Sequence, residues 1–262
     1  EILERYFNNS LNTDKEFLNL FKPYGVKGFE KLRVGAKGDS GYVMFDSYKL
    51  NQNKKKIAYS FGISDDVSWD EGMVKKGYDI FMYDHTINSL PHGKENNNKF
   101  HFFKEGISSE NHPEDSCRPL KEFMEINNHI NNEDLELVLK IDVEGAEWNF
   151  LQDIDTSILN KFSQILIELH FERNKDLDYY SYCVKKLTEN HFIFHVHNNN
   201  YTLTPYWRGF PIPIVFELSL ANKNLFEKEK NTTLFPDHKL DIIHKKNVPD
   251  FALHFPPFLP EK

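Results

Sequence analysis

The sequence predicts an α/β protein whose core is a single, mostly parallel sheet of seven strands. Short apolar runs that favour strands alternate with segments of helical length, and strands separated by helices form parallel sheets with right-handed crossovers. The last two predicted strands are joined only by a short, proline-containing loop. Such a loop cannot hold a crossover helix, so these two strands are expected to form a terminal antiparallel pair.

Each strand prediction rests on an apolar run that is bounded by polar or turn residues. These runs lie, in chain order, at residues 57–61, 78–83, 100–103, 135–141, 162–169, 192–196 and 213–219. Helices are expected between them at residues 68–76, 119–130, 146–151 and 178–189.

An N-terminal extension is expected to precede the sheet. Residues 1–30 carry apolar side chains near helical spacing, and residues 31–45 contain two short strand-like pieces with glycines between them, which is typical of a hairpin. We therefore divide the chain into a helix and hairpin extension (1–53), a main domain (54–220) and a C-terminal tail (221–262) packed on that domain.

Composition excludes several classes of function. The 262 residues carry a net charge of −8 and no long Lys/Arg block, whereas capture of nucleic acid needs a basic face. The two cysteines, Cys117 and Cys183, are far apart, which favours a reducing compartment over a disulfide scaffold. The N-terminus has no signal-peptide core, and no apolar run approaches the roughly 20 residues of a membrane span. A cytoplasmic protein without a membrane span is expected.

The carboxyl ends of the first strands are the expected place for a nucleotide-like cofactor, because open α/β sheets bind ligands there. Gly62 follows the first strand, but it stands alone, and the missing G-x-G-x-x-G pattern argues against a dinucleotide. Asp84 ends the second strand about 20 residues later, where such folds place an acid on the ribose hydroxyls. A plain strand-to-helix turn and an exposed strand-end acid are the structural alternatives. The expected cofactor contacts are Gly62, Ser64, Asp65, Asp84, Ile107, Ser108 and Asp142.

The fourth strand ends in Lys-Ile-Asp-Val-Glu-Gly-Ala-Glu-Trp over residues 140–148, with closely spaced carboxylates around a glycine. Burying such charges is costly unless they have partners. This motif resembles the signature of the FkbM-like methyltransferases. The likeness extends to residues 35–42 (Gly-Ala-Lys-Gly-Asp-Ser-Gly-Tyr), 59–66 and 167–170 (Ile-Glu-Leu-His), in the same order and over roughly residues 30–220. Ser40 departs from the pattern, because relatives often carry a glycine there.

The resemblance implies a Rossmann-like, class I methyltransferase fold with S-adenosylmethionine as the methyl donor. It also implies an oxygen nucleophile on a sugar or another small polar acceptor. We interpret the chain as an O-methyltransferase that acts on a sugar or nucleotide-linked sugar for capsule or another surface polysaccharide. An NAD-dependent sugar-modifying enzyme and a non-catalytic binding module on the same fold are the alternatives. The sequence predicts no oligomeric state.

A metal site is a further expectation, because Asp142, His170 and His197 end three successive predicted strands. Two imidazoles and a carboxylate suit a divalent transition metal such as Fe or Mn, which would lower the pKa of an acceptor hydroxyl. Without a metal, His170 is expected to act as the general base, with Glu144 or Asp142 orienting it or the acceptor. The alternative is that both histidines are ordinary polar residues at strand ends.

Overall fold

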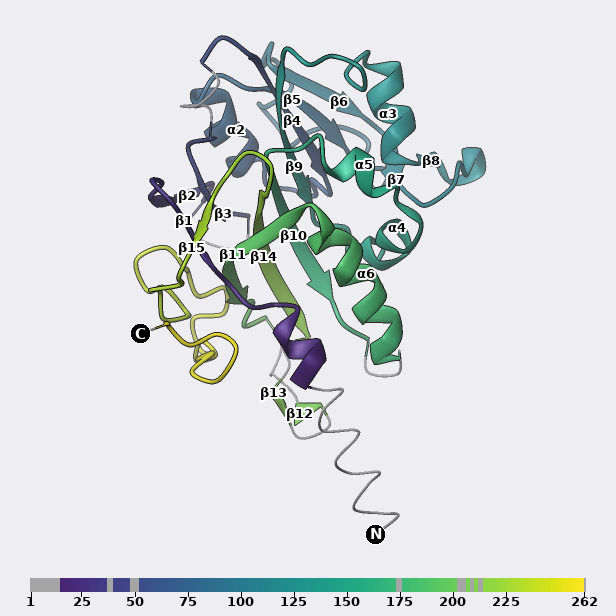
Figure 1. Ribbon diagram of the computed structural model, residues 1–262. Coiled ribbons are helices and arrows are strands. Elements are labelled where there is room, and N and C mark those ends of the chain that lie inside the picture. The colour runs from purple at the N-terminus through teal and green to yellow at the C-terminus, as the bar shows by residue number, and fades with distance from the viewer. Residues whose placement is uncertain are drawn as a thin grey trace.

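A computed structural model describes residues 15–36, 40–47, 52–172, 176–201, 206–207, 210–211 and 214–261. Its centre is a seven-stranded sheet with the order β11-β14-β10-β9-β4-β5-β6 (Figure 1). The strands are β4 (Lys55–Phe61), β5 (Asp79–Tyr83), β6 (Phe100–Phe103), β9 (Leu135–Ile141), β10 (Gln164–His170), β11 (His191–Asn198) and β14 (Val215–Asn222). Each of them corresponds to one of the seven predicted runs.

The direction of the strands also agrees with the prediction. β6, β5, β4, β9 and β10 pair in parallel, whereas β14 is antiparallel to both of its neighbours, β10 and β11. The strand order reverses at β4, which lies between β5 and β9. In an open sheet this reversal opens a crevice at the carboxyl ends of the strands. The Rossmann-like fold predicted from the sequence is therefore confirmed.

Helices cover both faces of the sheet. α3 (Leu120–Ile126), α4 (Glu147–Asp153), α5 (Thr156–Leu159) and α6 (Leu177–Glu189) pack on one face, and α2 (Ser68–Lys75) packs on the other (Figure 1). Successive side chains of β9 point to opposite faces of the sheet. Leu137 and Leu139 pack in the apolar cluster under α3, α4, α5 and α6, and Val138 packs in the cluster under α2. Among the described helices, none is long and apolar enough to cross a membrane.

The helix predicted at 119–130 is shorter than expected. α3 ends at Ile126, and Asn128 then takes a left-handed φ of 58°. The amide of His129 donates to the carbonyl of Met124 at 2.8 Å, which is the hydrogen bond of a Schellman-type helix end. The apolar spacing continued past this point, but the backbone turns away from the helix axis.

The N-terminal extension is fused to the sheet. β2 (Lys31–Val34) and β3 (Tyr42–Phe45) form the predicted hairpin, and Gln164 of β10 exchanges hydrogen bonds with the backbone of Phe45. Residues 1–14 of the predicted helix lie outside the described residues. Of the remainder, residues 15–19 are helical, and Pro23 prevents the helix from continuing to residue 30.

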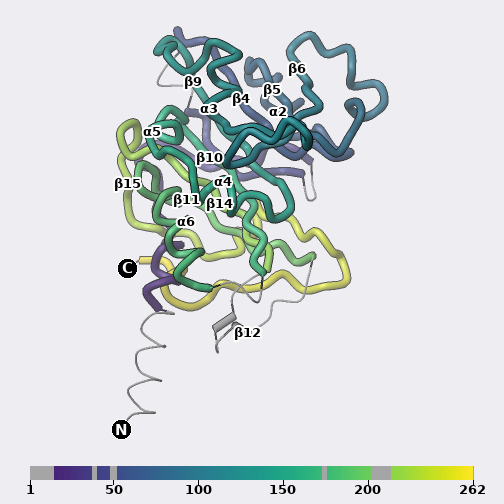
Figure 2. The backbone as a smooth tube through the Cα atoms, turned by 90° about the vertical axis from the view of Figure 1, so that its right-hand side faces the viewer, coloured from purple at the N-terminus to yellow at the C-terminus, as the bar shows by residue number. Residues whose placement is uncertain are grey.

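The C-terminal tail folds back along the same body (Figure 2). β15 (Lys228–Glu229) pairs with β1 (Gly25–Val26), and the side chains of Phe235, Leu253 and Phe258 are buried in the main apolar cluster. The remaining short elements are β7 (Gly106–Ile107), β8 (Cys117–Arg118), β12 (Tyr206–Trp207), β13 (Phe210–Pro211) and a 3₁₀ turn over Pro113–Asp115.

Asp70 in α2 is expected to make stability depend on pH. It is 2% exposed and its Oδ1 atom has no hydrogen-bond partner among the described residues. Burial raises its pKa to about 6, although Lys140 and Ser60 act to lower it. In the unfolded chain Asp70 ionises near pH 4, whereas in the folded protein it keeps its proton up to about pH 6. The free energy of unfolding should therefore fall by about 2–3 kcal/mol between about pH 4 and 6 and stay low above that range.

The variant Asp70→Asn keeps a neutral side chain of the same shape at every pH. Urea unfolding should therefore give equal stabilities for the variant and the parent at pH 4, and a more stable variant at pH 8. The exposed Asp153 provides the control, because Asp153→Asn should change stability equally at both pH values. A variant that is less stable than the parent at pH 8 would show that Asp70 is needed in its ionised form.

Candidate active site at the carboxyl ends of the strands

A cavity of about 290 Å³ opens where β4, β5 and β9 end, close to the lower limit of about 300 Å³ for typical small-molecule sites. Most of the cofactor contacts expected from the sequence line it, namely Gly62, Ser64, Asp65, Asp84, Ile107 and Asp142. Ser108 is not among the lining residues, and its hydroxyl donates to the carbonyl of Glu110. The crevice predicted from strand order therefore holds six of the seven residues.

Gly62 brings two strand ends into contact at the base of this cavity. Its φ is +78°, and a Cβ at this position would lie 1.6 Å from the carbonyl oxygen of Asp142. The carbonyl of Gly62 accepts a hydrogen bond from Nζ of Lys140 at 2.7 Å. Only glycine allows this turn to pass so close to the end of β9.

Asp84 fixes the turn that follows β4. Its Oδ2 accepts hydrogen bonds from the amides of Ile63 and Ser64, both at 2.9 Å, and its Oδ1 accepts from the amide and hydroxyl of Thr86 at 2.8 and 2.6 Å. Burial raises the pKa of Asp84, but these hydrogen bonds outweigh burial and the pKa lies below its usual value. A carboxylate has about four acceptor positions, so binding a ribose would require Asp84 to exchange some of these partners.

His170, at the end of β10, is held by a carboxylate that sequence reasoning did not select. Oε1 of Glu147 lies 3.2 Å from Nδ1 of His170 and accepts the His170 amide at 2.5 Å, while Oε2 accepts the amide of Gly145 at 2.8 Å. The Glu147 side chain is fully buried at the start of α4. Trp148 donates its indole N–H to the carbonyl of His170 at 2.6 Å, which fixes the end of the strand.

The other ring nitrogen of His170 faces an acidic opening. Nε2 lies 3.4 Å from Glu144 and 3.7 Å from Glu168. Burial lowers the pKa of His170, but the hydrogen bond and charge of Glu147 and the charges of Asp142 and Glu144 outweigh it, so the pKa is raised. Glu144 is 87% exposed and also lines the cavity. His170 therefore stands at the side of the cofactor cavity.

A possible metal-binding group includes two of the three predicted ligands. Within the described part of the chain, the ligand atoms of Asp142, Glu168 and His170 lie within 4.8 Å of one another. Oδ2 of Asp142 also accepts a hydrogen bond from the Tyr42 hydroxyl at 2.8 Å. Glu168 takes the third place, where His197 was expected.

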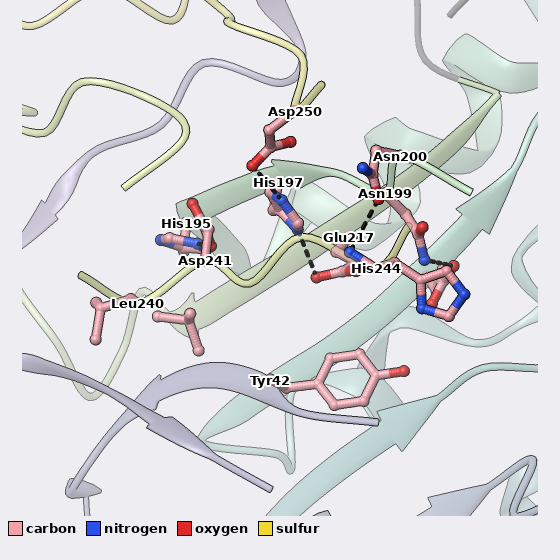
Figure 3. Close-up of polar contacts among 12 residues, drawn as sticks. Tyr42, His195, His197, Asn199, Asn200, Glu217, Leu240, Asp241, His244 and Asp250 are labelled. Atoms are coloured by element: carbon pink, nitrogen blue, oxygen red, sulfur yellow. Dashed lines mark hydrogen bonds and ion pairs between the residues drawn. The ribbon is translucent and has the colours of Figure 1, made fainter. Parts of the chain in front are cut away.

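His197 lies outside this group because β14 separates β11 from β10. In the paired register His197 faces Glu217, and Glu217 faces Glu168 on the far side. Nδ1 of His197 is 3.1 Å from Glu217 and Nε2 is 3.3 Å from Asp250 (Figure 3). Burial lowers the pKa of His197, but these two carboxylates raise it well above the usual value. Both nitrogens are thus engaged in ion pairs.

Sequence reasoning missed Glu147, Glu168 and Tyr42 as members of the site. All three lie within the motifs quoted above. Glu168 could have been identified from the sequence, because an acid between Ile167 and Leu169 interrupts an apolar strand. A buried charge of this kind requires partners. Asn199 is one of these partners, since its amide donates to Glu168 Oε1 at 3.2 Å.

Comparison with known proteins agrees with this geometry. A family model described as a methyltransferase domain matches residues 8–210. No curated protein matches the chain significantly. Two of the solved structures that match the chain are described here, and both are only distantly similar. One is provisionally described as a hemolysin from Streptococcus thermophilus, with 12% identity, a TM-score of 0.38 and coverage of 70% of this chain and 71% of that one.

The other is provisionally described as an S-adenosylmethionine-dependent methyltransferase from Streptococcus mutans. It is 10% identical with a TM-score of 0.36, and the match covers 76% of this chain and 57% of that one. Both likenesses are weak, and the assignment rests on the family model, which spans most of the sheet and the whole of the cavity. The chain belongs to this family of methyltransferase domains.

Proposed function

We propose that this protein transfers a methyl group from S-adenosylmethionine to a hydroxyl of a small polar acceptor in the cytoplasm. Membership of the methyltransferase family supports methyl transfer from this donor in general. The finer proposal, a sugar or nucleotide-linked sugar for capsule or another surface polysaccharide, is supported by the resemblance to FkbM-like enzymes. The observation that carries it is the His170–Glu147 pair beside the cofactor cavity.

The residues of the cavity fit the chemistry of the donor. Ile107 and Tyr83 offer apolar surface to an adenine, and the carboxylates of Asp65 and Asp142 suit the cationic ammonium and sulfonium groups. We propose that Asp84 contacts the ribose through exchange of its Thr86 hydrogen bonds. When bound, the donor supplies an electrophilic methyl group on sulfur.

The donor supplies the methyl group, so the protein must remove the proton from the acceptor hydroxyl. A sugar hydroxyl has a pKa far above neutrality, so little alkoxide forms unaided. Glu147 can hold Nδ1–H of His170, which leaves Nε2 as the proton acceptor, as in other carboxylate–histidine pairs. Asp142, with Tyr42 on its other oxygen, and the exposed Glu144 lie where they can orient the acceptor hydroxyl.

A divalent metal is a second way to activate the hydroxyl. The grouping of Asp142, Glu168 and His170 specifically favours it, and Glu147 on Nδ1 of His170 is the kind of outer carboxylate that orients metal-binding imidazoles. One nitrogen and two carboxylate ligands suit Mn or Fe. If a metal activates the hydroxyl, excess chelator should abolish methyl transfer without weakening donor binding, and Mn²⁺ or Fe²⁺ should restore it. Full activity in chelator would assign deprotonation to His170 alone.

The direct test is an assay for S-adenosylhomocysteine with labelled donor and a panel of sugars, sugar phosphates and nucleotide-linked sugars. Acceptor-dependent product that disappears in the variant His170→Ala is the expected result. Calorimetry with S-adenosylmethionine and NAD should show binding of the first only. Binding of NAD alone would favour the NAD-dependent alternative. Donor binding without turnover on any acceptor would favour a non-catalytic module.

A further inference from the structure

The C-terminal tail is fastened to the end of β11 by buried polar contacts. Nε2 of His195 lies 2.7 Å from Oδ1 of Asp241, and Nε2 of His197 lies 3.3 Å from Oδ2 of Asp250 (Figure 3). Both histidines are 2% exposed. Two carboxylates of the tail, nine residues apart, therefore dock on alternate residues of one strand.

Asn200 fixes the loop between these two anchors. Its Oδ1 accepts the amides of His244 and Lys245, both at 2.9 Å, and its Nδ2 donates to the carbonyls of Lys245 and Val248 at 3.0 and 2.7 Å. The asparagine is 2% exposed. Four hydrogen bonds from one buried side chain hold the backbone of this loop in a defined position.

This loop carries cationic groups at the surface, next to the aromatic ring of Tyr201, which follows β11. Nζ of Lys245 lies 4.1 Å from the centroid of the Tyr201 ring, and the rings of Tyr201 and His244 are 5.2 Å apart. Tyr201 is 53% exposed, and Lys245 and Lys246 are exposed. We refer to Tyr201, His244 and Lys245 as the basic loop surface.

A single residue connects the basic loop surface to the candidate active site. Asn199 accepts the amide of Tyr201 on its Oδ1 at 2.9 Å and donates from its Nδ2 to Glu168 at 3.2 Å. Glu168 in turn faces His170. The backbone of Tyr201 is thus linked through Asn199 to Glu168, one of the carboxylates around His170.

The two neighbouring regions differ in charge. The opening around His170 presents Asp142, Glu144 and Glu168, which disfavour an anion, whereas the basic loop surface favours one. Two of its three residues, His244 and Lys245, also lie beyond residue 210, where the family match ends. A segment outside the shared domain is a natural place for recognition of a particular acceptor.

We propose that Tyr201, His244 and Lys245 bind the phosphate group of a phosphorylated sugar acceptor and so direct its hydroxyl toward His170. This inference rests on the proposed function and narrows its substrate class to sugars that carry a phosphate. Lys245 supplies the charge, and the phosphate gains charge-assisted hydrogen bonds. The carboxylates at the opening keep the phosphate from binding there in the reverse orientation.

The test measures binding of glucose 1-phosphate, inorganic phosphate and glucose to the full chain by calorimetry. We expect the two phosphate compounds to bind and glucose to bind much more weakly. The variants Lys245→Ala and Tyr201→Ala should each weaken binding of the phosphate compounds about tenfold, since bonds to charged groups have this magnitude. The variant Lys239→Ala, at another exposed lysine of the tail, should bind them as the parent does.

Affinity for S-adenosylmethionine should be unchanged in all three variants. Equal affinity of the parent and Lys245→Ala for glucose 1-phosphate, or no binding by the parent, would overturn the inference. Loss of phosphate binding in the variants, with no methylated product from any acceptor, would keep the subsite and contradict the proposed O-methylation. The two proposals therefore fail in different measurements.

Discussion

Methyl transfer is expected to fall about 10²- to 10⁴-fold when His170 is replaced with alanine, while affinity for S-adenosylmethionine stays the same. This range is the usual contribution of a positioned general base. His170 does not line the donor cavity, so the donor should bind as in the parent. The exposed His238 gives the matched control, and His238→Ala should leave the rate unchanged. A parental rate in the His170 variant would rule out its role as base and as metal ligand.

The same experiment extends to Glu147. The variant Glu147→Gln removes the charge that holds Nδ1 of His170, so the rate should fall about tenfold or more while the donor still binds. Because the two residues act as one unit, the double variant should be no slower than His170→Ala alone. Effects that multiply would show that Glu147 acts independently of His170.

Alanine at position 62 is expected to have the largest effect on stability. Its Cβ would lie 1.6 Å from the carbonyl oxygen of Asp142, which is backbone and cannot move away alone. The turn after β4 or the end of β9 must shift, and the left-handed φ adds about 1–2 kcal/mol. We expect Gly62→Ala to lose about 3 kcal/mol or more of unfolding free energy in urea and to show no detectable donor binding.

Gly93 provides a control for backbone strain. Its φ is +82°, nearly that of Gly62, but an added Cβ meets no atom within 4 Å. Gly93→Ala should therefore lose only about 1–2 kcal/mol and bind the donor normally. Equal losses in the two variants would show that close contact with Asp142 contributes nothing to the effect at position 62.

The strands could be predicted from the sequence because each one is an apolar run of sufficient length, and residues 135–141 match β9 at both ends. The positions of Gly62, Asp84 and Asp142 followed from chain order, since parallel strands bring their carboxyl ends to one edge. This rule places residues together only when their strands are neighbours in the sheet, and it succeeds for β4, β5 and β9, whose order follows from the fold class.

The rest of the site depends on contacts that chain order does not specify. Glu147 approaches His170 only because the first turn of α4 packs beside the end of β10. The expectation for His197 assumed that the sixth strand brings its last residues close to the fifth, whereas β14 lies between them. The tail was expected to pack on the main domain, but its anchors at Asp241 and Asp250 are lone acids in a polar stretch.

The position of β14 has a consequence for synthesis of the chain. In the described sheet β11 pairs only with β14, and β14 also covers the outer edge of β10. Until residues 215–222 leave the ribosome, β11 has no place in the sheet and β10 presents an unpaired edge, which is a template for aggregation. A fragment that ends at residue 210, where the family match stops, would retain this exposed edge permanently. Completion of the sheet must await synthesis of residues 215–222, and expression of the shorter fragment should yield aggregates.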